Sequence, residues 1–305
     1  MAALPDVGTR GGRGAPYGIR SVSISAGLIA NVRHHLESRG KSPAERSLRK
    51  IFNSMGEALQ THKNRVAVVS GAAKGIGQEL AIQLAQRGAA LALLDIADLS
   101  QTRDLVEQAG GKAIAIHCDV SREEDWNTAG KLVKEAYGRC DILVNNAGIY
   151  PNVHIDEMDF KTWRRTFEIN LDSLFLSSKV FVPMMREHQW GRIVNISSTS
   201  IVTSAVGVSH YIATKMGIIG FTRGLANDLG KDFITVNAIA PALTATPGTR
   251  DLPDAVRDGI VNRQAFKRMA VPHDIVGPIL FLTSDDAQFV TGQLLAVDGG
   301  MMKVG

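Results

Sequence analysis

Cysteines and long apolar runs are the features that this sequence lacks most clearly. Only two cysteines, Cys118 and Cys140, occur among 305 residues. They cannot build a disulfide framework, so we expect free, buried thiols in a reducing compartment. No apolar run approaches the ~20 residues that a membrane-spanning helix requires. These absences predict a cytoplasmic protein without a membrane partner.

An excess of basic over acidic residues is also missing outside the start of the chain. Residues 1–65 contain 11 Lys and Arg against 4 Asp and Glu, whereas the remaining residues contain 23 against 26. The net charge of +4 therefore originates in the N-terminal segment. Without a basic excess, the body of the chain is not expected to bind nucleic acid.

Residues 1–61 differ in composition from the rest of the chain. They are rich in Gly, Arg and Ser, and Asp6 is the one acidic residue among the first 36. We predict a basic, disordered extension here, followed by a single dinucleotide-binding catalytic domain over residues 62–305. Three alternatives stay open: sequence translated upstream of a native start such as Met55, organellar targeting by residues 1–40, and a nucleic-acid-binding arm.

Short apolar, β-branched runs alternate with helical patterns from Arg65 onward. Such runs are typical of parallel strands that are buried on both faces. The predicted strands cover residues 66–69, 90–94, 113–117, 141–144, 191–196, 234–238 and 294–297. The alternation predicts an α/β fold: a doubly wound, Rossmann-type parallel sheet of about seven strands with helices on both faces.

Two segments depart from this alternation. Asp159 is expected to cap a long helix that contains Asn170 and that Pro183 kinks or ends. Residues 244–270 show no regular pattern, and a long irregular connection of this kind is typical of a substrate lid.

A glycine-rich turn, SGAAKGIG at residues 70–77, joins the first strand to the first helix. Gly71 permits the tight turn, Gly75 lets the backbone approach a pyrophosphate, and Gly77 allows close contact between helix and strand. Asp95 ends the second strand, where an acid accepts hydrogen bonds from the adenosine ribose and repels a 2′-phosphate. Lys74 would favour that phosphate, but we give the acid more weight. The turn therefore predicts NAD as cofactor.

Other polar residues also follow predicted strands. Asp119 and Val120 would lie near an adenine ring, and Asn146, Ala147 and Gly148 follow a central strand. Because parallel strands end at the same edge of a sheet, these residues should meet at one ligand site.

Tyr211 and Lys215 are four residues apart on a predicted helix, downstream of the Ser197-Ser198 pair. Positions i and i+4 share a helix face, so the lysine should stabilise the phenolate and lower the tyrosine pKa. Tyr211 is therefore a candidate general acid and base, and the serine could polarise a substrate carbonyl. No metal site is expected.

Taken together, SGAAKGIG, DV (119–120), NNAG (145–148), Asn170, ISS (196–198), YIATK (211–215) and Pro241 resemble the short-chain dehydrogenase/reductase family. The resemblance implies that Tyr211 is the catalytic acid and base and that Ser198 orients the substrate oxygen. Lys215 would bind the nicotinamide ribose, and Asn170 would hold a water in a proton relay. It also implies dimers or tetramers formed through the helices around Asn170 and Tyr211. The expected cofactor contacts are Gly71, Lys74, Gly75, Ile76, Gly77, Asp95, Asp119, Val120, Asn146, Ala147, Gly148, Tyr211, Lys215, Pro241, Thr244 and Thr246.

Within the family, stretches such as GRCDILVNNAGIYP and HYIATK resemble the bacterial 1-phenylethanol dehydrogenases. That resemblance implies an NAD-dependent oxidation of an aryl or hydrophobic secondary alcohol to its ketone. The residues expected to line the substrate pocket, besides Ser198, are Tyr150, Pro151, Val206 and Leu243. The alternatives are a 3-oxoacyl-carrier-protein reductase, a pyridoxal-type dehydrogenase, and a non-catalytic NAD-binding scaffold that binds NAD without turnover.

Overall fold

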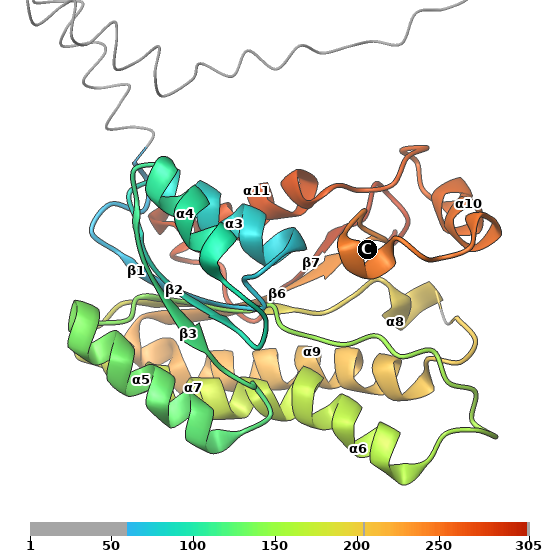
Figure 1. Cartoon of the computed structure of the whole chain (residues 1–305), viewed down its shortest axis with the longest axis horizontal. Coiled ribbons are helices and arrows are strands. Elements are labelled where there is room, and N and C mark those ends of the chain that lie inside the picture. Colours follow the sequence, from blue (N-terminus) through green and yellow to red (C-terminus); the bar gives the residue numbers. More distant parts are fainter. Residues whose placement is uncertain (1–59, 204, 304–305) are drawn as a thin grey trace, which may run out of the picture. The chain divides into compact units, whose positions relative to one another are not determined.

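One sheet of seven parallel strands organises residues 60–203 and 205–303, which are the residues that this computed structural model describes (Figure 1). The predicted extension lies outside them, except for its last two residues. The strand order is β3-β2-β1-β4-β5-β6-β7, so the predicted doubly wound fold is confirmed. The strands are β1 (Val66–Ser70), β2 (Ala90–Asp95), β3 (Lys112–His117), β4 (Ile142–Asn145), β5 (Gly191–Ile196), β6 (Ile234–Pro241) and β7 (Leu294–Val297).

The inner strands of the sheet are largely apolar on both faces because helices cover both faces. In β1, Ala67 and Val69 belong to one buried cluster, whereas Val66 and Val68 belong to another. Alternate residues of a strand point to opposite faces, so a continuous apolar run supplies two hydrophobic layers at once.

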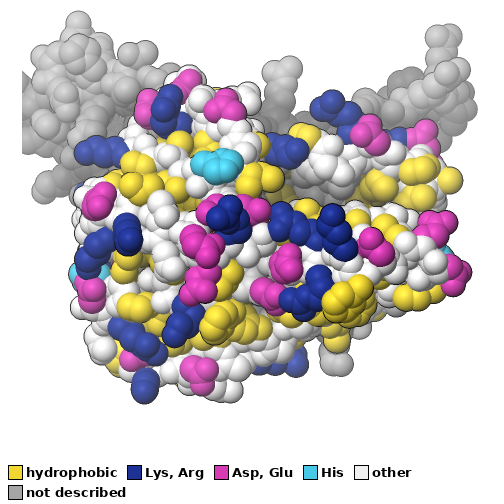
Figure 2. All heavy atoms as spheres, turned by 60° about the horizontal axis from the view of Figure 1, so that its bottom comes forward, with side chains coloured by type: hydrophobic (Ala, Val, Ile, Leu, Met, Phe, Trp, Pro, Cys, Tyr) yellow, Lys and Arg dark blue, Asp and Glu magenta, His cyan; other side chains and the backbone are white. Residues whose placement is uncertain are grey.

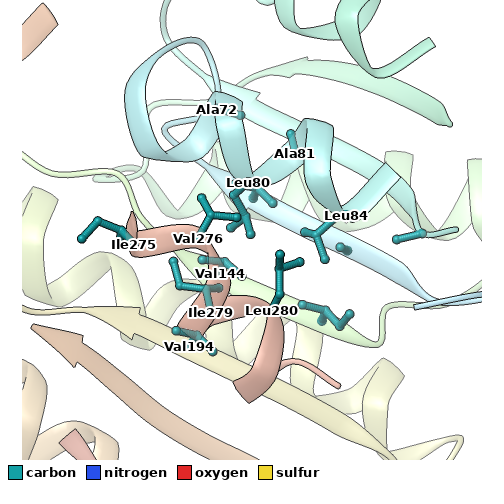
Figure 3. Close-up of a cluster of buried hydrophobic side chains, with 14 of the residues drawn as sticks. Ala72, Leu80, Ala81, Leu84, Val144, Val194, Ile275, Val276, Ile279 and Leu280 are labelled. Carbon is teal, nitrogen blue, oxygen red and sulfur yellow. The ribbon is translucent and has the colours of Figure 1, made fainter. Parts of the chain in front are cut away.

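One face of the sheet is covered by α3 (Gly75–Gln86), α4 (Ser100–Gln108) and α11 (Pro272–Leu282) (Figure 1). Figure 3 shows Leu80 and Leu84 of α3 and Ile279 of α11 gathered in one buried cluster with Val144 and Val194 of the sheet. All five side chains are inaccessible to solvent. Their contact sets the position of the first turn of α3 relative to the central strands.

The other face is covered by α5 (Glu123–Tyr137), α7 (Ser173–Arg186) and α9 (Ser209–Leu229), and α6 (Phe160–Phe167) precedes α7. Trp126 of α5 packs edge-to-face on Phe181 of α7, with ring centroids 6.2 Å apart. Two short helices complete the description, α8 (Ser200–Thr203) and α10 (Asp254–Arg263).

The predicted long helix is present, and the carboxylate of Asp159 caps it by accepting from the Thr162 N–H. The helix that Asp159 caps is interrupted by a π-helical turn at Glu168–Asp172. Pro183 does not end α7, which continues to Arg186, because Phe181, Val182 and Met185 stay packed on the sheet. Burial of these side chains outweighs the cost of about 3 kcal/mol for an internal proline.

One local prediction was wrong, because residues 244–270 are not irregular throughout. They contain a 3-10 turn at Pro247–Thr249 and the helix α10. Pro253 before the helix, Asp254 in its first turn and Arg263 in its last turn were signals that favour a helix here.

Among the described residues, no helix is long and apolar enough to cross a membrane. Cys118 and Cys140 are both free and buried, as predicted.

The amino ends of the strands carry an ionic cluster around Asp141, whose side chain is fully buried. Its carboxylate accepts hydrogen bonds from the Val66 backbone N–H at 2.8 Å and from Nε of Arg139 at 2.9 Å. Nearby, the guanidinium carbons of Arg65 and Arg192 lie 3.6 and 4.2 Å from the ring centroid of Trp190. This cluster ties β1, β4 and β5 together at the edge of the sheet opposite the carboxyl ends.

Replacement of Asp141 by asparagine should lower the free energy of unfolding by about 3 kcal/mol, because it leaves a partly buried arginine without its counter-charge. Urea denaturation followed by circular dichroism measures the change. Asp104→Asn is the control, since Asp104 pairs with Arg103 on the surface and should change stability by less than about 0.5 kcal/mol. Equal effects of the two substitutions would contradict a structural role for Asp141.

Candidate active site

The glycine turn is shaped so that only glycine fits at three positions. Gly71 and Gly75 have φ angles of +65° and +62°. A Cβ at Gly71 would lie 2.8 Å from Nδ2 of Asn146, and a Cβ at Gly77 would overlap the Gly71 carbonyl oxygen. Lys74, the N-cap of α3, offers no side-chain hydrogen bond to the first turn. The first backbone N–H groups of α3 are thus left without a side-chain cap, and they fit a phosphate group.

Asn146 holds this turn against the end of β4. Its Nδ2 donates to the carbonyl oxygens of Ser70 and Gly71, both at 3.0 Å. In return, the Ser70 hydroxyl accepts from the N–H groups of Asn146 and Ala147, both at 3.1 Å. The side chain of Asn146 is therefore committed to the backbone of the turn rather than directed outward.

Asp95 lies directly beside the glycine turn. One carboxylate oxygen accepts from the Ala73 N–H and the other from the Ala97 N–H, each at 3.0 Å. The carboxylate is thus fixed at the end of β2, where the sequence places a ribose partner. The side chain of Lys74 is exposed.

Asp119 and Val120 follow β3 at the same edge. Burial raises the pKa of Asp119, but hydrogen bonds from Ser121 and Arg165 outweigh it, and the net pKa is lowered. The carboxylate therefore stays ionised, with one oxygen 3.1 Å from Arg165. Val120 is buried, so its side chain is not exposed at the edge.

Asn170 is placed by the π-helical turn. Its amide accepts from the Ile149 N–H at 2.8 Å and donates to the Ile149 carbonyl at 3.0 Å. It also donates to the hydroxyl of Thr214 at 3.3 Å. Asn170 therefore ties the segment after β4 to α9, one residue away from Lys215.

Lys215 is buried against the end of β5. Its Nζ donates to the Ile196 carbonyl at 2.7 Å, and burial lowers the pKa of Lys215 to about 8. A Cβ placed on Gly148 would lie 3.6 Å from this Nζ and 3.2 Å from Oδ1 of Asn170. The backbone at Gly148 thus lies against both side chains, and the three predicted residues meet.

The pKa of Tyr211 differs from the sequence prediction. Burial raises the pKa of Tyr211 to about 12, although hydrogen bonding from the Ser198 and Ser200 hydroxyls lowers it. The predicted lowering by Lys215 is not seen, because Nζ lies 5.5 Å from the phenol ring centroid and donates to Ile196 instead. Tyr211 is thus a protonated phenol at neutral pH in this structure.

Ser200 was missed by the sequence analysis. Its N–H and its hydroxyl both donate to the Ser198 hydroxyl, at 3.1 and 2.8 Å. The run of hydroxyl residues at 197–200 was a signal that polar groups gather here, but it does not say which of them face the site.

Tyr150 covers one side of Tyr211, with ring centroids 4.6 Å apart and ring planes at 87°. Its loop is held by two contacts across the site, from the Asn152 amide to the Val206 carbonyl at 3.1 Å and from the Val153 N–H to the Gly207 carbonyl at 2.8 Å. Val206 is 77% exposed, whereas Pro151 is partly buried. The loop that carries Tyr150 therefore lies beside the loop that carries Val206.

The segment after β6 returns to the glycine turn. A Cβ on Gly75 would lie 3.3 Å from Cγ2 of Thr246, so Thr246 lies against the turn. Thr244 is buried, and its hydroxyl donates to the Ala242 carbonyl, so it does not reach outward. The carbonyl of Leu243 accepts from the Ala270 N–H, and Pro241 accepts from Thr199. No group of His, Cys, Asp and Glu side chains suited to a metal occurs within the described ranges.

Comparisons with known proteins agree on one family. Residues 71–302 match the family described as enoyl-(acyl carrier protein) reductase. The chain is 37% identical to (2S)-[(R)-hydroxy(phenyl)methyl]succinyl-CoA dehydrogenase subunit BbsD of Thauera aromatica, over 78% of this chain and 96% of that protein. It is 38% identical to cis-4-hydroxycyclohexanecarboxylate dehydrogenase of Sinomonas cyclohexanicum, over 82% and 100%.

Reductases of acyl thioesters are also related. The 3-oxoacyl-[acyl-carrier-protein] reductase FabG of Thermotoga maritima is 34% identical, over 79% of this chain and 98% of its own. The crystal structure of levodione reductase is similar with a TM-score of 0.74 and 28% identity, covering 78% of this chain and 97% of that one.

The fold and these relatives define an oxidoreductase that acts on CH–OH groups with a nicotinamide cofactor. More particularly, the chain belongs to the short-chain dehydrogenase/reductase family.

Replacement of Gly75 by alanine should weaken NADH binding by at least about 10-fold, because a Cβ there strains the backbone and fills space beside Thr246. Fluorescence titration with NADH measures the dissociation constant. Gly138→Ala is a matched control: Gly138 also has a positive φ, of +72°, but has no neighbour within 4 Å of an added Cβ. If both variants lose affinity equally, backbone strain alone explains the effect and the turn is not the binding site.

Proposed function

We propose that this protein interconverts a hydrophobic, aryl-bearing secondary alcohol and its ketone, with NAD as cofactor. The observation that carries the proposal is the group of side chains around the Tyr211 phenol: the hydroxyls of Ser198 and Ser200 and the ring of Tyr150. An acid and base, a hydroxyl partner for the substrate oxygen and an apolar wall are what this reaction needs.

The roles proposed for the residues follow from their contacts. In the oxidation, Tyr211 takes the proton of the alcohol while Ser198 donates a hydrogen bond to the same oxygen. Lys215 and Asn170 are both buried and bonded to backbone carbonyls of the site. Their proposed role is to relay the proton between Tyr211 and solvent. Because the pKa of Tyr211 is raised by burial, the phenol suits the reduction at neutral pH, and the oxidation should accelerate as the pH rises. When bound, the nicotinamide ring supplies the hydride chemistry.

The cofactor preference rests on Asp95. Its carboxylate is held in place by two backbone N–H groups at the end of β2, beside the glycine turn. A fixed negative charge there accepts hydrogen bonds from ribose hydroxyls and repels a 2′-phosphate. Lys74, which would favour NADP, is exposed, and the carboxylate is bonded to the N–H of the residue before it, Ala73.

The substrate class rests on the side chains at the mouth of the site. Tyr150 packs against the Tyr211 ring and is 46% exposed, and Val206, 77% exposed, lies on the loop that bonds to Asn152. The Thauera aromatica relative is named for a hydroxyl on a phenyl-bearing carbon. The relation to FabG favours a second candidate, the reduction of a 3-oxoacyl thioester. A pyridoxal-type alcohol and a scaffold that only binds NAD are the remaining alternatives.

We also propose that residues 62–305 act as one catalytic domain in a cytoplasmic homodimer or homotetramer. The face that Figure 2 brings forward carries interspersed basic and acidic side chains, with hydrophobic side chains between them. A groove of about 710 Å³ runs between α5 and α7, and Phe175 at its wall is 54% exposed. Burial of this groove by a second copy would remove apolar surface from water.

Tyr211→Phe should lower kcat for alcohol oxidation by about 10³-fold, because it removes the group that accepts the proton, while NADH binding changes little. Steady-state kinetics and fluorescence titration measure the two effects. Tyr137→Phe is the matched control, since the Tyr137 hydroxyl donates to the Leu91 carbonyl away from the site. Turnover that survives in Tyr211→Phe would exclude Tyr211 as the acid and base.

The same assays, run on the unmodified protein, discriminate between substrate classes. 1-Phenylethanol should be oxidised with NAD, whereas activity on a 3-oxoacyl thioester alone would favour the second candidate. NAD binding without turnover of either compound would favour the scaffold.

Asp95→Asn should reduce the preference for NAD over NADP by at least about 10-fold, because it removes the charge that repels a 2′-phosphate and keeps the side-chain shape. The ratio of kcat/KM for the two cofactors measures the preference. Asp98→Asn serves as control, because Asp98 is exposed and bonds to Ser100. An unmodified protein that already prefers NADP would overturn the assignment of Asp95.

A further inference from the structure

Four consecutive hydroxyl residues, Ser197 to Ser200, divide into two pairs. Ser197 donates to the carbonyl of Lys215 at 2.9 Å, and Thr199 donates to the carbonyl of Pro241 at 3.0 Å. Both are buried, and they join the end of β5 to α9 and β6. Ser198 and Ser200 are partly exposed and bond to each other instead. The backbone therefore presents two hydroxyls, not one, to the site.

Ser200 occupies the acceptor positions of Ser198. The Ser200 N–H lies 3.1 Å and the Ser200 hydroxyl 2.8 Å from the Ser198 oxygen. A hydroxyl has one proton and two acceptor positions. With both acceptor positions filled, the proton of Ser198 is the remaining group that can face a substrate oxygen.

The N–H alone would explain Ser198 as an ordinary cap of the short helix α8. Such a cap requires one backbone donor. The second contact, from the Ser200 hydroxyl, is additional, and a hydroxyl that accepts a hydrogen bond becomes a stronger donor itself. Ser200 thus acts on Ser198, the residue that is proposed to hold the substrate oxygen.

We propose that Ser200 is a positioning residue, which sets Ser198 as a hydrogen-bond donor toward the substrate oxygen when substrate is bound and toward the Tyr211 phenolate when it is not. This inference rests on the proposed function. Of the other titratable groups near Tyr211, Tyr150 contacts its ring and Lys215 lies 5.5 Å from its centroid, while His210 precedes it on α9. None of these three donates to Ser198 in the described structure, whereas the N–H and the hydroxyl of Ser200 both do.

Ser200→Ala keeps the N–H cap of Ser198 and removes only the hydroxyl. It should lower kcat for alcohol oxidation by about 10-fold, with the dissociation constant for NADH unchanged. Because hydrogen bonding from Ser198 lowers the pKa of Tyr211, a weaker Ser198 donor should move the rising limb of the pH profile to higher pH. Ser200→Thr, which restores a hydroxyl, should return both quantities toward those of the unmodified protein.

A second measurement does not depend on turnover. The ¹³Cζ resonance of Tyr211, assigned by its loss in Tyr211→Phe, reports the ionisation of the phenol during a pH titration. In Ser200→Ala its change should begin at higher pH than in the unmodified protein. Ser209→Ala is the control, because Ser209 lies on the exposed first turn of α9 and should alter neither quantity.

The outcomes separate the two proposals. Unchanged kinetics together with an unchanged Tyr211 resonance in Ser200→Ala would overturn the role of Ser200. So would a loss of activity that Ser200→Thr does not restore, since that would indicate a merely structural effect. An unmodified protein that oxidises no alcohol, yet shows the expected shift of the Tyr211 resonance, would overturn the proposed substrate and support the role of Ser200.

Discussion

The amide of Asn146 is the contact on which the arrangement of the site depends. β1 and β4 are neighbours in the sheet although two strands separate them in the sequence, so the chain reverses its winding direction between them. Such a switch point opens a crevice at the carboxyl ends of the strands. Asn146 spans that crevice at its base and gives both amide protons to the glycine turn. The phosphate-binding turn and the end of β4 are thereby held as one rigid unit.

A buried chain of hydrogen-bonded polar side chains connects β4 to α9. The hydroxyl of Ser177 donates to Asn145, Asn145 donates to Asn195, and Asn195 donates to Thr222. The chain crosses from α7 through β4 and β5 to α9, and its members are almost inaccessible to solvent. A fully paired network in a low-dielectric interior specifies one register. The helix that carries Tyr211 and Lys215 is therefore fixed along its axis relative to β4 and β5, the strands that lead to Gly148 and Ser198.

Much of this architecture could be predicted from the sequence because the spacing of apolar residues and the residue types of a turn are visible within short stretches of the chain. The strands appeared as apolar runs, and the glycine turn was recognisable between a strand and a helix. Properties that depend on burial could not be predicted. The i to i+4 spacing identified Lys215 as a neighbour of Tyr211, but it carried no information on how far Tyr211 is buried. The predicted direction of the Tyr211 pKa shift was therefore wrong. For the same reason, the hydroxyl run at 197–200 could not reveal which residues face inward. α10 was missed although its charges were readable.

The π-helical turn at Glu168–Asp172 has a consequence for the tolerance of this region to insertions and deletions. A π turn holds one residue more than the α-helical hydrogen-bonding pattern accommodates, and each residue turns a helix by about 100°. Loss of a single residue between α6 and α7 would allow a continuous α-helix, with better local hydrogen bonding. It would also rotate Asn170 away from Ile149 or turn the apolar face of α7 off the sheet. The length of this segment is therefore under a stricter constraint than the identity of most of its residues.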